Sequence, residues 1–166
     1  MGHKLEDCRE MFRHACAFCE CADMAFERFK HDTADIEFYS TPAVVNAAFA
    51  CEVFCKALLK YDDISYNKIH KLADLYNKLP NDIKECIKSI VMCTYGKWKD
   101  DFGFDCLDNI SNVFAEWRYI FEHDWNISAS VHLQTGFLFA FRDALREICC
   151  QVFFNKSWEQ YVRGEF

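Results

Sequence analysis

Apolar residues recur at intervals of three or four along most of this chain, which is the spacing of amphipathic helices. The pattern predicts a first helix over about residues 5–29. A second helix is predicted over about residues 42–61, with Ser40 and Thr41 as a cap and Pro42 in its first turn. This second segment is apolar on nearly all sides, so we expect it at the centre of the fold.

The rest of the chain alternates between polar breaks and further helical patterns. A turn at residues 62–65 precedes a short helix that holds His70, Leu72 and Leu75, and Pro80 opens another helix that reaches about residue 93. The remaining predicted segments are a loop at residues 95–103, a helix at 104–122, a polar break at 124–130 and a last helix at 131–154. Residues 1–166 are therefore expected to form one all-α domain, an antiparallel up-and-down helical bundle of four main helices with additional short helices.

Composition agrees with this pattern and narrows the function. The chain has 166 residues, 52% of them hydrophobic, and contains only five Gly and two Pro, so the turn residues that a β-rich fold needs are scarce. The formal net charge is −7. A protein that coats nucleic acid without specificity needs many basic residues to displace counterions, so any contact with RNA must be local.

Eleven cysteines raise the question of cellular location. The chain opens with no charged and then apolar leader, and Cys149 and Cys150 sit among large apolar residues where free cysteine behaves as a small hydrophobe. We therefore expect reduced thiols and a cytoplasmic protein. The most apolar stretches, residues 43–59 and 137–154, are interrupted by charged residues, so no membrane helix is predicted.

The cysteines also suggest a zinc alternative. Cys16 and Cys19 share one side of the first helix, and Cys51 and Cys55 are four apart on the second. These four thiols would make a zinc site if the two faces met, but buried free cysteine is the more common arrangement. No metal and no cofactor are predicted.

Arg118 and His123 form the most informative spacing in the chain. An arginine offers permanent donors to a phosphate, and a histidine moves a proton near neutral pH, so the pair fits RNA cleavage without a metal. Arg9 and His14 have the same spacing and are interpreted as surface charge. Arg142 and Arg146 offer further cationic surface, for which ion pairing with nearby acids is the preferred interpretation.

Polar residues within apolar helical sequence are the second signal. Asn46, Glu52 and Lys56 interrupt the central predicted helix, where burial of a polar group is costly. Glu52 and Lys56 are four apart and would pair on a helix, as would Arg118 and Glu122. A structural bridge of Arg118 to Glu122 with an uninvolved His123 therefore stands beside the catalytic interpretation.

The order of these blocks resembles that of HEPN domains, the higher eukaryote and prokaryote nucleotide-binding helical bundles. The resemblance covers about residues 40–150 and rests on residues 42–59, on His70-Lys71-Leu72 and on residues 116–123. Many members of the family are metal-independent ribonucleases of toxin-antitoxin and phage-defence systems whose Arg-x(4 to 6)-His motifs meet across a homodimer. The resemblance implies that Arg118 and His123 are catalytic. The residues that it implies as supporting the site are Asn46, Glu52, Lys56, His70, Tyr119 and Glu122.

Two functions follow from these expectations. The first is a metal-independent endoribonuclease, a toxin or phage-defence effector, that acts on RNA as a homodimer and is restrained by an antitoxin. In it, a ribose 2′-hydroxyl attacks the adjacent phosphate and leaves a 2′,3′-cyclic phosphate. The alternative is a non-catalytic HEPN module that binds a nucleotide or a nucleotidyltransferase-type partner. Tyr119 favours it, since the family often has a small polar residue directly after the arginine. A purely structural bundle ranks last, because it leaves the polar residues of the second helix unexplained.

Overall fold

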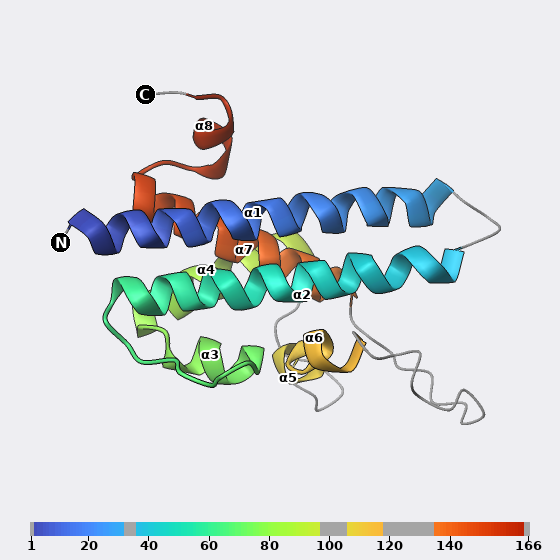
Figure 1. Ribbon diagram of the computed structural model, residues 1–166, viewed down its shortest axis with the longest axis horizontal. Helices are drawn as coiled ribbons and strands as arrows, with labels where there is room; N and C mark the ends of the chain where they lie inside the picture. Colours follow the sequence, from blue (N-terminus) through green and yellow to red (C-terminus); the bar gives the residue numbers. More distant parts are fainter. Residues whose placement is uncertain (1, 32–35, 97–105, 118–134, 165–166) are drawn as a thin grey trace.

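Helix is the only regular secondary structure in the part of the chain that the structure describes (Figure 1). The structure is a computed structural model that describes residues 2–31, 36–96, 106–117 and 135–164. Over these residues the predicted all-α class is confirmed. In chain order the elements are α1 (Gly2–His31), α2 (Ile36–Tyr61), α3 (Leu72–Lys78), α4 (Asn81–Tyr95), α5 (Cys106–Ile110), α6 (Val113–Trp117), α7 (Thr135–Phe154) and α8 (Trp158–Val162).

The two long helices α1 and α2 lie side by side along the longest axis of the molecule (Figure 1). The face of α1 that is fully buried repeats every three or four residues, and much of it is small, so the two helices can approach closely. It consists of Cys8, Phe12, Ala15, Cys19 and Ala22. The predicted helix at residues 5–29 is confirmed and is slightly longer at both ends.

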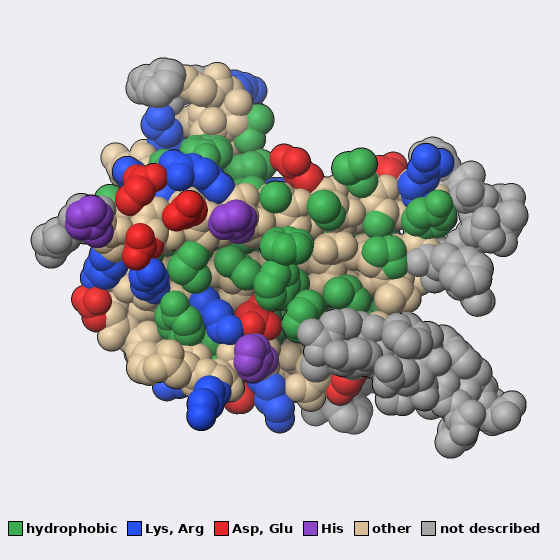
Figure 2. Space-filling model, viewed as in Figure 1, with side chains coloured by type: hydrophobic (Ala, Val, Ile, Leu, Met, Phe, Trp, Pro, Cys, Tyr) green, Lys and Arg blue, Asp and Glu red, His purple; other side chains and the backbone are tan. Residues whose placement is uncertain are grey.

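Ion pairs join the N-terminal end of α1 to the C-terminal end of α2, so the two helices run antiparallel. Lys4 Nζ lies 2.7 Å from Asp63 Oδ2, and Lys60 Nζ lies 2.7 Å from Asp7 Oδ2. Figure 2 shows charged side chains gathered toward this end of the molecule, while the opposite end of the same face is mostly apolar or uncharged. Each exposed pair contributes less than about 1 kcal/mol, so packing of the buried faces supplies most of the stability of this contact.

Helix α2 is the central element, as its apolar sequence predicted, and it packs against α1, α3, α6 and α7. Its predicted start at Pro42 is wrong, because the helix begins at Ile36 and holds Pro42 inside. Proline has no N–H for the carbonyl four residues upstream, so one helical hydrogen bond is missing there. The turns of α2 before Pro42 continue alongside α1 (Figure 1), so the missing hydrogen bond does not end the helix.

The second half of the chain contributes a third long helix, α7, which packs against α1 and α2. Helix α7 contacts α1, α2 and α4, and Phe137, Phe141 and Leu145 on it are fully buried. It begins at Thr135, whereas the helix was predicted from residue 131, and residues 131–134 lie outside the described residues. Pro80 stands directly before α4, as predicted, and α4 ends at Gly96, whose φ of 76° is the left-handed conformation that glycine adopts most easily.

The short helix α8 was not predicted from the sequence. Ser157 caps it, with its side chain accepting from the backbone of Gln160 while the Gln160 side chain accepts from Ser157 N. Its Tyr161 ring lies 5.4 Å from the ring of Phe12, which in turn lies 5.3 Å from Phe154. This aromatic contact holds the C-terminal helix against α1.

Two predictions about the short helices are wrong. The helix predicted over residues 104–122 is interrupted in its described part, because Ser111 and Asn112 form a turn between α5 and α6. The Ser111 side chain accepts from Ala73 N at 2.9 Å, and the Ser111 carbonyl accepts from Leu72 N at 3.1 Å. These bonds satisfy two free amides at the start of α3. The second wrong prediction concerns α3. His70 was predicted inside this short helix and instead lies in the segment before it.

Among the described residues, one helix is long and apolar enough to cross a membrane, judged by length and composition alone. It spans residues 39–61 of α2, and 67% of its qualifying stretch is buried inside the protein. A buried core helix meets the same criterion, and the central position of α2 places it in that class.

Candidate functional site

A carboxylate at the middle of α2 gathers two basic side chains from different parts of the chain. Lys56, one turn further along α2, donates to Glu52 Oε1 at 2.7 Å. His70, from the segment between α2 and α3, places Nδ1 at 2.9 Å from the same oxygen. Three of the predicted site residues are thus brought together, and we refer to Glu52, Lys56 and His70 as the carboxylate cluster.

Burial differs sharply across the carboxylate cluster. Glu52 is 3% exposed, whereas the side chain of Lys56 is 18% exposed and that of His70 is 67% exposed. The charge of Glu52 is therefore removed from water, with the ammonium partly covered and the imidazole at the surface. A buried carboxylate is costly unless it is paired, and both partners offset this cost.

One oxygen of Glu52 has no hydrogen-bond partner among the residues that the structure describes. Both basic groups contact Oε1, and Oε2 is buried without a donor among the described residues. Leaving a buried acceptor unpaired costs about 1–3 kcal/mol, and such groups in folded proteins often mark a site that serves a purpose other than stability.

The pairing sets the orientation of the His70 ring. An ionised carboxylate can only accept hydrogen bonds, so His70 Nδ1 carries the proton that points at Glu52. The His70 side chain as a whole is 67% exposed. A buried carboxylate that holds one nitrogen of an imidazole leaves the second nitrogen positioned to exchange a proton with another molecule.

The segment that carries His70 is fixed to the helices that lead toward Arg118. The hydrogen bonds from Leu72 N and Ala73 N to Ser111 join the start of α3 to the turn before α6. Helix α6 packs against α2 through Phe114, whose ring stacks on Phe49 at a centroid distance of 4.9 Å. The carboxylate cluster and α6 therefore share one anchored region of the fold.

The other predicted site residues divide into two groups. Asn46 is not joined to the carboxylate cluster, because its side-chain amide donates to the Pro42 carbonyl at 2.8 Å. It lies six residues before Glu52, and positions six apart on a helix point about 120° away from each other. The remaining predicted residues, Arg118, Tyr119, Glu122 and His123, lie outside the described residues.

Sequence reasoning missed two residues around the carboxylate cluster. The Lys56 ammonium lies 6.0 Å from the centre of the Tyr66 ring, a weak cation–π contact that also covers the lysine. Ser111 anchors the segment next to His70 from 38 residues away in the chain. Neither residue belongs to a periodic pattern, so nothing in the sequence indicated them.

Arg9, which was interpreted as surface charge, also has a structural role. Its Nε and Nη2 donate to the carbonyl of Phe153 at 3.1 and 3.0 Å, near the C-terminal end of α7. The last carbonyls of a helix have no intrahelical partner, so this arginine caps α7. The Arg9 side chain is still 33% exposed and lies 3.6 Å from Glu6, so this structural contact adds to its predicted surface position, and His14 is exposed, as predicted.

A second buried charge lies on α7. Arg142 is 3% exposed and contacts Asp23 on α1 at 2.7 Å and Asp143 at 2.8 Å. Burial would lower its pKa, but the two carboxylates outweigh this effect and raise it. Arg146 lies 3.0 Å from Asp143 and packs over the ring of Trp158. The predicted ion pairing is confirmed, but Arg142 is buried and does not form cationic surface.

The zinc alternative is not supported. Within the described ranges, no group of three or more His, Cys, Asp or Glu side chains could hold a metal ion. Burial raises the pKa of the Cys51 thiol well above its ordinary value, and it raises the pKa of Cys55, where the Glu52 carboxylate adds to the effect. Cys51 and Cys55 are fully buried in the hydrophobic core, where free cysteine behaves as a small hydrophobe.

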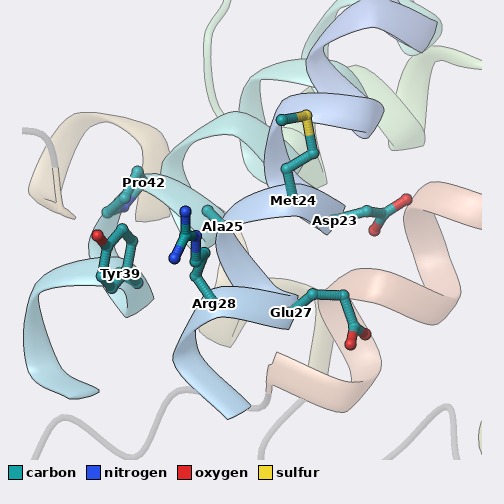
Figure 3. A pocket seen from close by; sticks show the side chains of 7 residues that line it. All are labelled: Asp23, Met24, Ala25, Glu27, Arg28, Tyr39 and Pro42. Carbon is teal, nitrogen blue, oxygen red and sulfur yellow. The ribbon is translucent and has the colours of Figure 1, made fainter. Parts of the chain in front are cut away.

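An open depression of about 870 Å³ lies between the C-terminal part of α1 and the start of α2 (Figure 3). None of the predicted site residues lines it. The side chains do not converge on a point, since Arg28 lies toward Tyr39 and Pro42 whereas Glu27 points away from them (Figure 3). The lining residues are Asp23, Met24, Ala25, Glu27, Arg28, Tyr39 and Pro42. The carboxylate cluster is therefore the better candidate for chemistry.

Comparisons of this chain with protein-family models, with curated proteins and with solved structures found no match.

Proposed function

We propose that this chain is a HEPN-type, metal-independent endoribonuclease that acts as a homodimer, as a toxin or phage-defence effector. The observation that supports the proposal best is the carboxylate cluster, in which a buried Glu52 holds Lys56 and the exposed His70. Glu52 Oε2 is buried and has no hydrogen-bond partner among the described residues, an arrangement that stability alone does not explain. The HEPN resemblance assigns these same residues to the active site beside Arg118 and His123.

In this proposal the helices α1, α2, α4 and α7 are the four main helices of an antiparallel up-and-down bundle. Arg118 and His123 follow α6 directly in the sequence, and α6 packs against α2, the helix that carries Glu52. Each protomer of the homodimer supplies one Arg118 and one His123 to a shared cleft. Two residues five apart on one continuous helix would point about 140° from each other, so the proposal requires either a helix that ends or distorts near Glu122 or residues from both protomers in one site.

The proposed reaction needs no metal ion. The ribose 2′-oxygen attacks the adjacent phosphorus while His123 takes the 2′-hydroxyl proton, a P–O2′ bond forms, and the bond from phosphorus to the 5′-oxygen of the next nucleotide breaks. The permanent charge and the fork of donors of Arg118 stabilise the negative charge that grows on the phosphoryl oxygens. The products are a 2′,3′-cyclic phosphate and a 5′-hydroxyl.

The test uses purified wild type, Arg118→Ala and His123→Ala on a ribo-oligonucleotide and on the same oligonucleotide with a single 2′-deoxy residue at the cleavage position. Wild type is expected to cut only the all-ribo strand, and both variants to lose at least about 100-fold in rate. His14→Ala and Arg163→Ala serve as matched controls, because both residues are exposed and lie on α1 and next to α8. Cutting of the deoxy strand, or unchanged rates in both variants, would refute the mechanism.

A non-catalytic binding module is the second candidate, and two observations favour it. Tyr119 stands where the family often has a small polar residue, and the net charge of −7 opposes tight RNA binding. This candidate predicts a rise in the unfolding temperature with a nucleotide and intact RNA in the assay above. The same RNA assay therefore decides between the two candidates.

A further inference from the structure

His70 combines an exposed side chain with an anchored ring. Its side chain is 67% exposed, and its Nδ1 lies 2.9 Å from Oε1 of Glu52. Glu52 is only 3% exposed, so the carboxylate that holds the ring belongs to the packed interior. His14, which is exposed on α1, makes no such contact with the described residues. The ring of His70 is therefore held in one orientation, unlike that of an ordinary surface histidine.

The contact with Glu52 decides which nitrogen of the ring is the nucleophile. A carboxylate only accepts hydrogen bonds, so Nδ1 carries the proton that points at Glu52, and the lone pair of the neutral ring lies on Nε2. The negative charge beside the Nδ1 proton pushes electron density toward Nε2. A nucleophile or base that is oriented by a third group in this way is the usual arrangement for covalent chemistry.

The charges around the imidazole favour an anionic reactant. Lys56 lies 2.7 Å from Oε1 of Glu52, so the ammonium balances the charge of the carboxylate. Lys68 and Lys71 are exposed and flank the histidine in the sequence, and Asp74 is the first acid that follows them. An anion that approaches the ring therefore meets more positive than negative charge on this segment.

The backbone beside the ring is held as well. Leu72 N and Ala73 N donate to the carbonyl and the side chain of Ser111 at 3.1 and 2.9 Å. The ring itself is held by Glu52, whose Oε1 takes both basic groups while Oε2 is buried without a donor among the described residues. Pairing of the carboxylate alone does not require this arrangement, since full satisfaction would use both oxygens. A nucleophile that is fixed by its neighbours reacts without first ordering its side chain.

We propose that His70 is a phosphoryl acceptor, which takes the group at Nε2 from a phosphoramidate, a donor whose phosphoryl group is bonded to nitrogen. Glu52 is a positioning residue, because it acts only through the imidazole. The acceptor consists of residues that the structure describes, so it is complete without Arg118 and His123 and is independent of RNA cleavage.

The transfer balances without another reactant. The lone pair of Nε2 attacks phosphorus, an N–P bond forms, and the bond from phosphorus to the protonated donor nitrogen breaks. The electron pair of the broken bond leaves with that nitrogen, which departs as a neutral amine. The ring of His70 keeps its proton on Nδ1 and becomes positively charged, so its hydrogen bond to Glu52 becomes a charge-assisted pair.

The test treats the folded full-length chain with potassium phosphoramidate and follows each histidine by peptide mass spectrometry under alkaline conditions, where phosphohistidine survives. His70 is expected to be phosphorylated at least about tenfold faster than His3 and His14, the exposed histidines of α1. Phosphorus NMR should show the Nε2 isomer at His70, because Glu52 occupies Nδ1. In urea, which unfolds the chain, the three histidines should react at similar rates.

Glu52→Gln is the main variant, because it keeps an oxygen that accepts from Nδ1 and removes the negative charge. It is expected to slow phosphorylation of His70 by about tenfold, toward the rate of His14, with the helical content unchanged by circular dichroism. Glu85→Gln, exposed on α4, is the matched control and should leave the rate at His70 unchanged. His70→Ala should remove the fast reaction and leave the rates at His3 and His14 as they are.

The outcomes separate an acceptor from a structural histidine. Fast phosphorylation of His70 at Nε2 that is lost in urea and in Glu52→Gln supports both roles. A rate at His70 no higher than at His14, or phosphorylation at Nδ1, would overturn the acceptor role, and the contact would then only satisfy the buried carboxylate. An equal advantage for His70 in urea or in Glu52→Gln would assign it to the neighbouring lysines and overturn the role of Glu52.

Discussion

Glu52 on α2 and Arg142 on α7 are each 3% exposed, yet their partners satisfy them to different degrees. Every nitrogen of the Arg142 guanidinium contacts a carboxylate oxygen, with Nε 2.9 Å from Asp143, Nη2 2.8 Å from Asp143 and Nη1 2.7 Å from Asp23. Glu52 uses Oε1 for both of its partners, and within the described ranges its Oε2 is buried without a hydrogen-bond donor.

The exposure of the partners differs as well. Arg142 also lies over the ring of Phe139 at 4.6 Å, and its carboxylates come from the two helices that it joins. It therefore acts as a structural contact between α1 and α7. Glu52 holds an imidazole that is two-thirds exposed, so the buried charge is presented to the surface through His70. Packing between helices accounts for the buried charge of Arg142, whereas it leaves Oε2 of Glu52 unexplained among the described residues.

Arg142→Met is expected to have the largest effect on stability. It removes a buried cation, its contacts with two helices and its packing on Phe139, so unfolding should become easier by about 3 kcal/mol. Urea denaturation measures this change. Arg163→Met, at an exposed position next to α8, should cost less than about 0.5 kcal/mol. A loss below about 1 kcal/mol in Arg142→Met would show that the contact between α1 and α7 does not depend on this charge.

Ser111→Ala is expected to have the next largest effect. It removes the side-chain acceptor of Ala73 N at the start of α3, which should cost about 1–2 kcal/mol. Hydrogen exchange should accelerate at Ala73, while Leu72 keeps its bond to the Ser111 carbonyl. Ser89→Ala, exposed on α4, is the matched control and should not destabilise the fold. Unchanged exchange at Ala73 would contradict the anchoring of the His70 segment to α6.

Alkaline pH should destabilise the fold moderately through buried thiols such as Cys19. Burial raises the pKa of Cys19 from 9.0 to about 11, and Arg142 and Arg146 oppose this rise. Between these values the unfolded thiol loses its proton and the folded thiol keeps it, so stability falls as pH rises from about 9 toward 11. At pH 9.5 one such thiol lowers the unfolding free energy by about 1 kcal/mol. Urea denaturation of wild type and Cys19→Ser at pH 7 and at pH 9.5 measures how much of the loss of unfolding free energy comes from Cys19. The same loss in both proteins would contradict a contribution from this thiol.

Glu52→Gln is expected to have the smallest effect on stability. Glutamine keeps an oxygen that accepts from His70 and Lys56, and its amide nitrogen takes the place of the unpaired Oε2. The substitution loses the ion pairs but also removes a buried charge, so the two effects on the unfolding free energy should cancel to within about 1 kcal/mol. Urea denaturation should show this small change beside reduced RNA cleavage. Glu85→Gln, exposed on α4, is the control. A loss of more than about 3 kcal/mol would make Glu52 a structural residue like Arg142.

Local pattern predicted most of the helices. The spacing of apolar residues located α1 and α7, and Pro80 located the start of α4. The start of α2 was missed because proline usually marks a first turn, whereas here the helix holds Pro42 inside. The break between α5 and α6 was missed because its cause, the bonds of Ser111 to the start of α3, joins residues far apart in the chain.

For the candidate site, too, contacts within one helix could be predicted from the sequence, whereas contacts between distant segments could not. Glu52 and Lys56 are one turn apart, so their pairing could be read from the sequence, and the resemblance placed His70 with them. The roles of Arg9 and Arg142 could not be predicted, because their partners Phe153 and Asp23 lie 144 and 119 residues away. Long-range partners of charged residues depend on the packed fold and leave no signal in local spacing.

The most direct test of the central claim is the chemistry of the RNA ends. Purified wild type and His123→Ala protein are each incubated with mixed cellular RNA in EDTA, and the new ends are identified. The account predicts 2′,3′-cyclic phosphate ends and 5′-hydroxyl ends from wild type alone. Intact RNA with both proteins, or new ends that lack the cyclic phosphate, would contradict it.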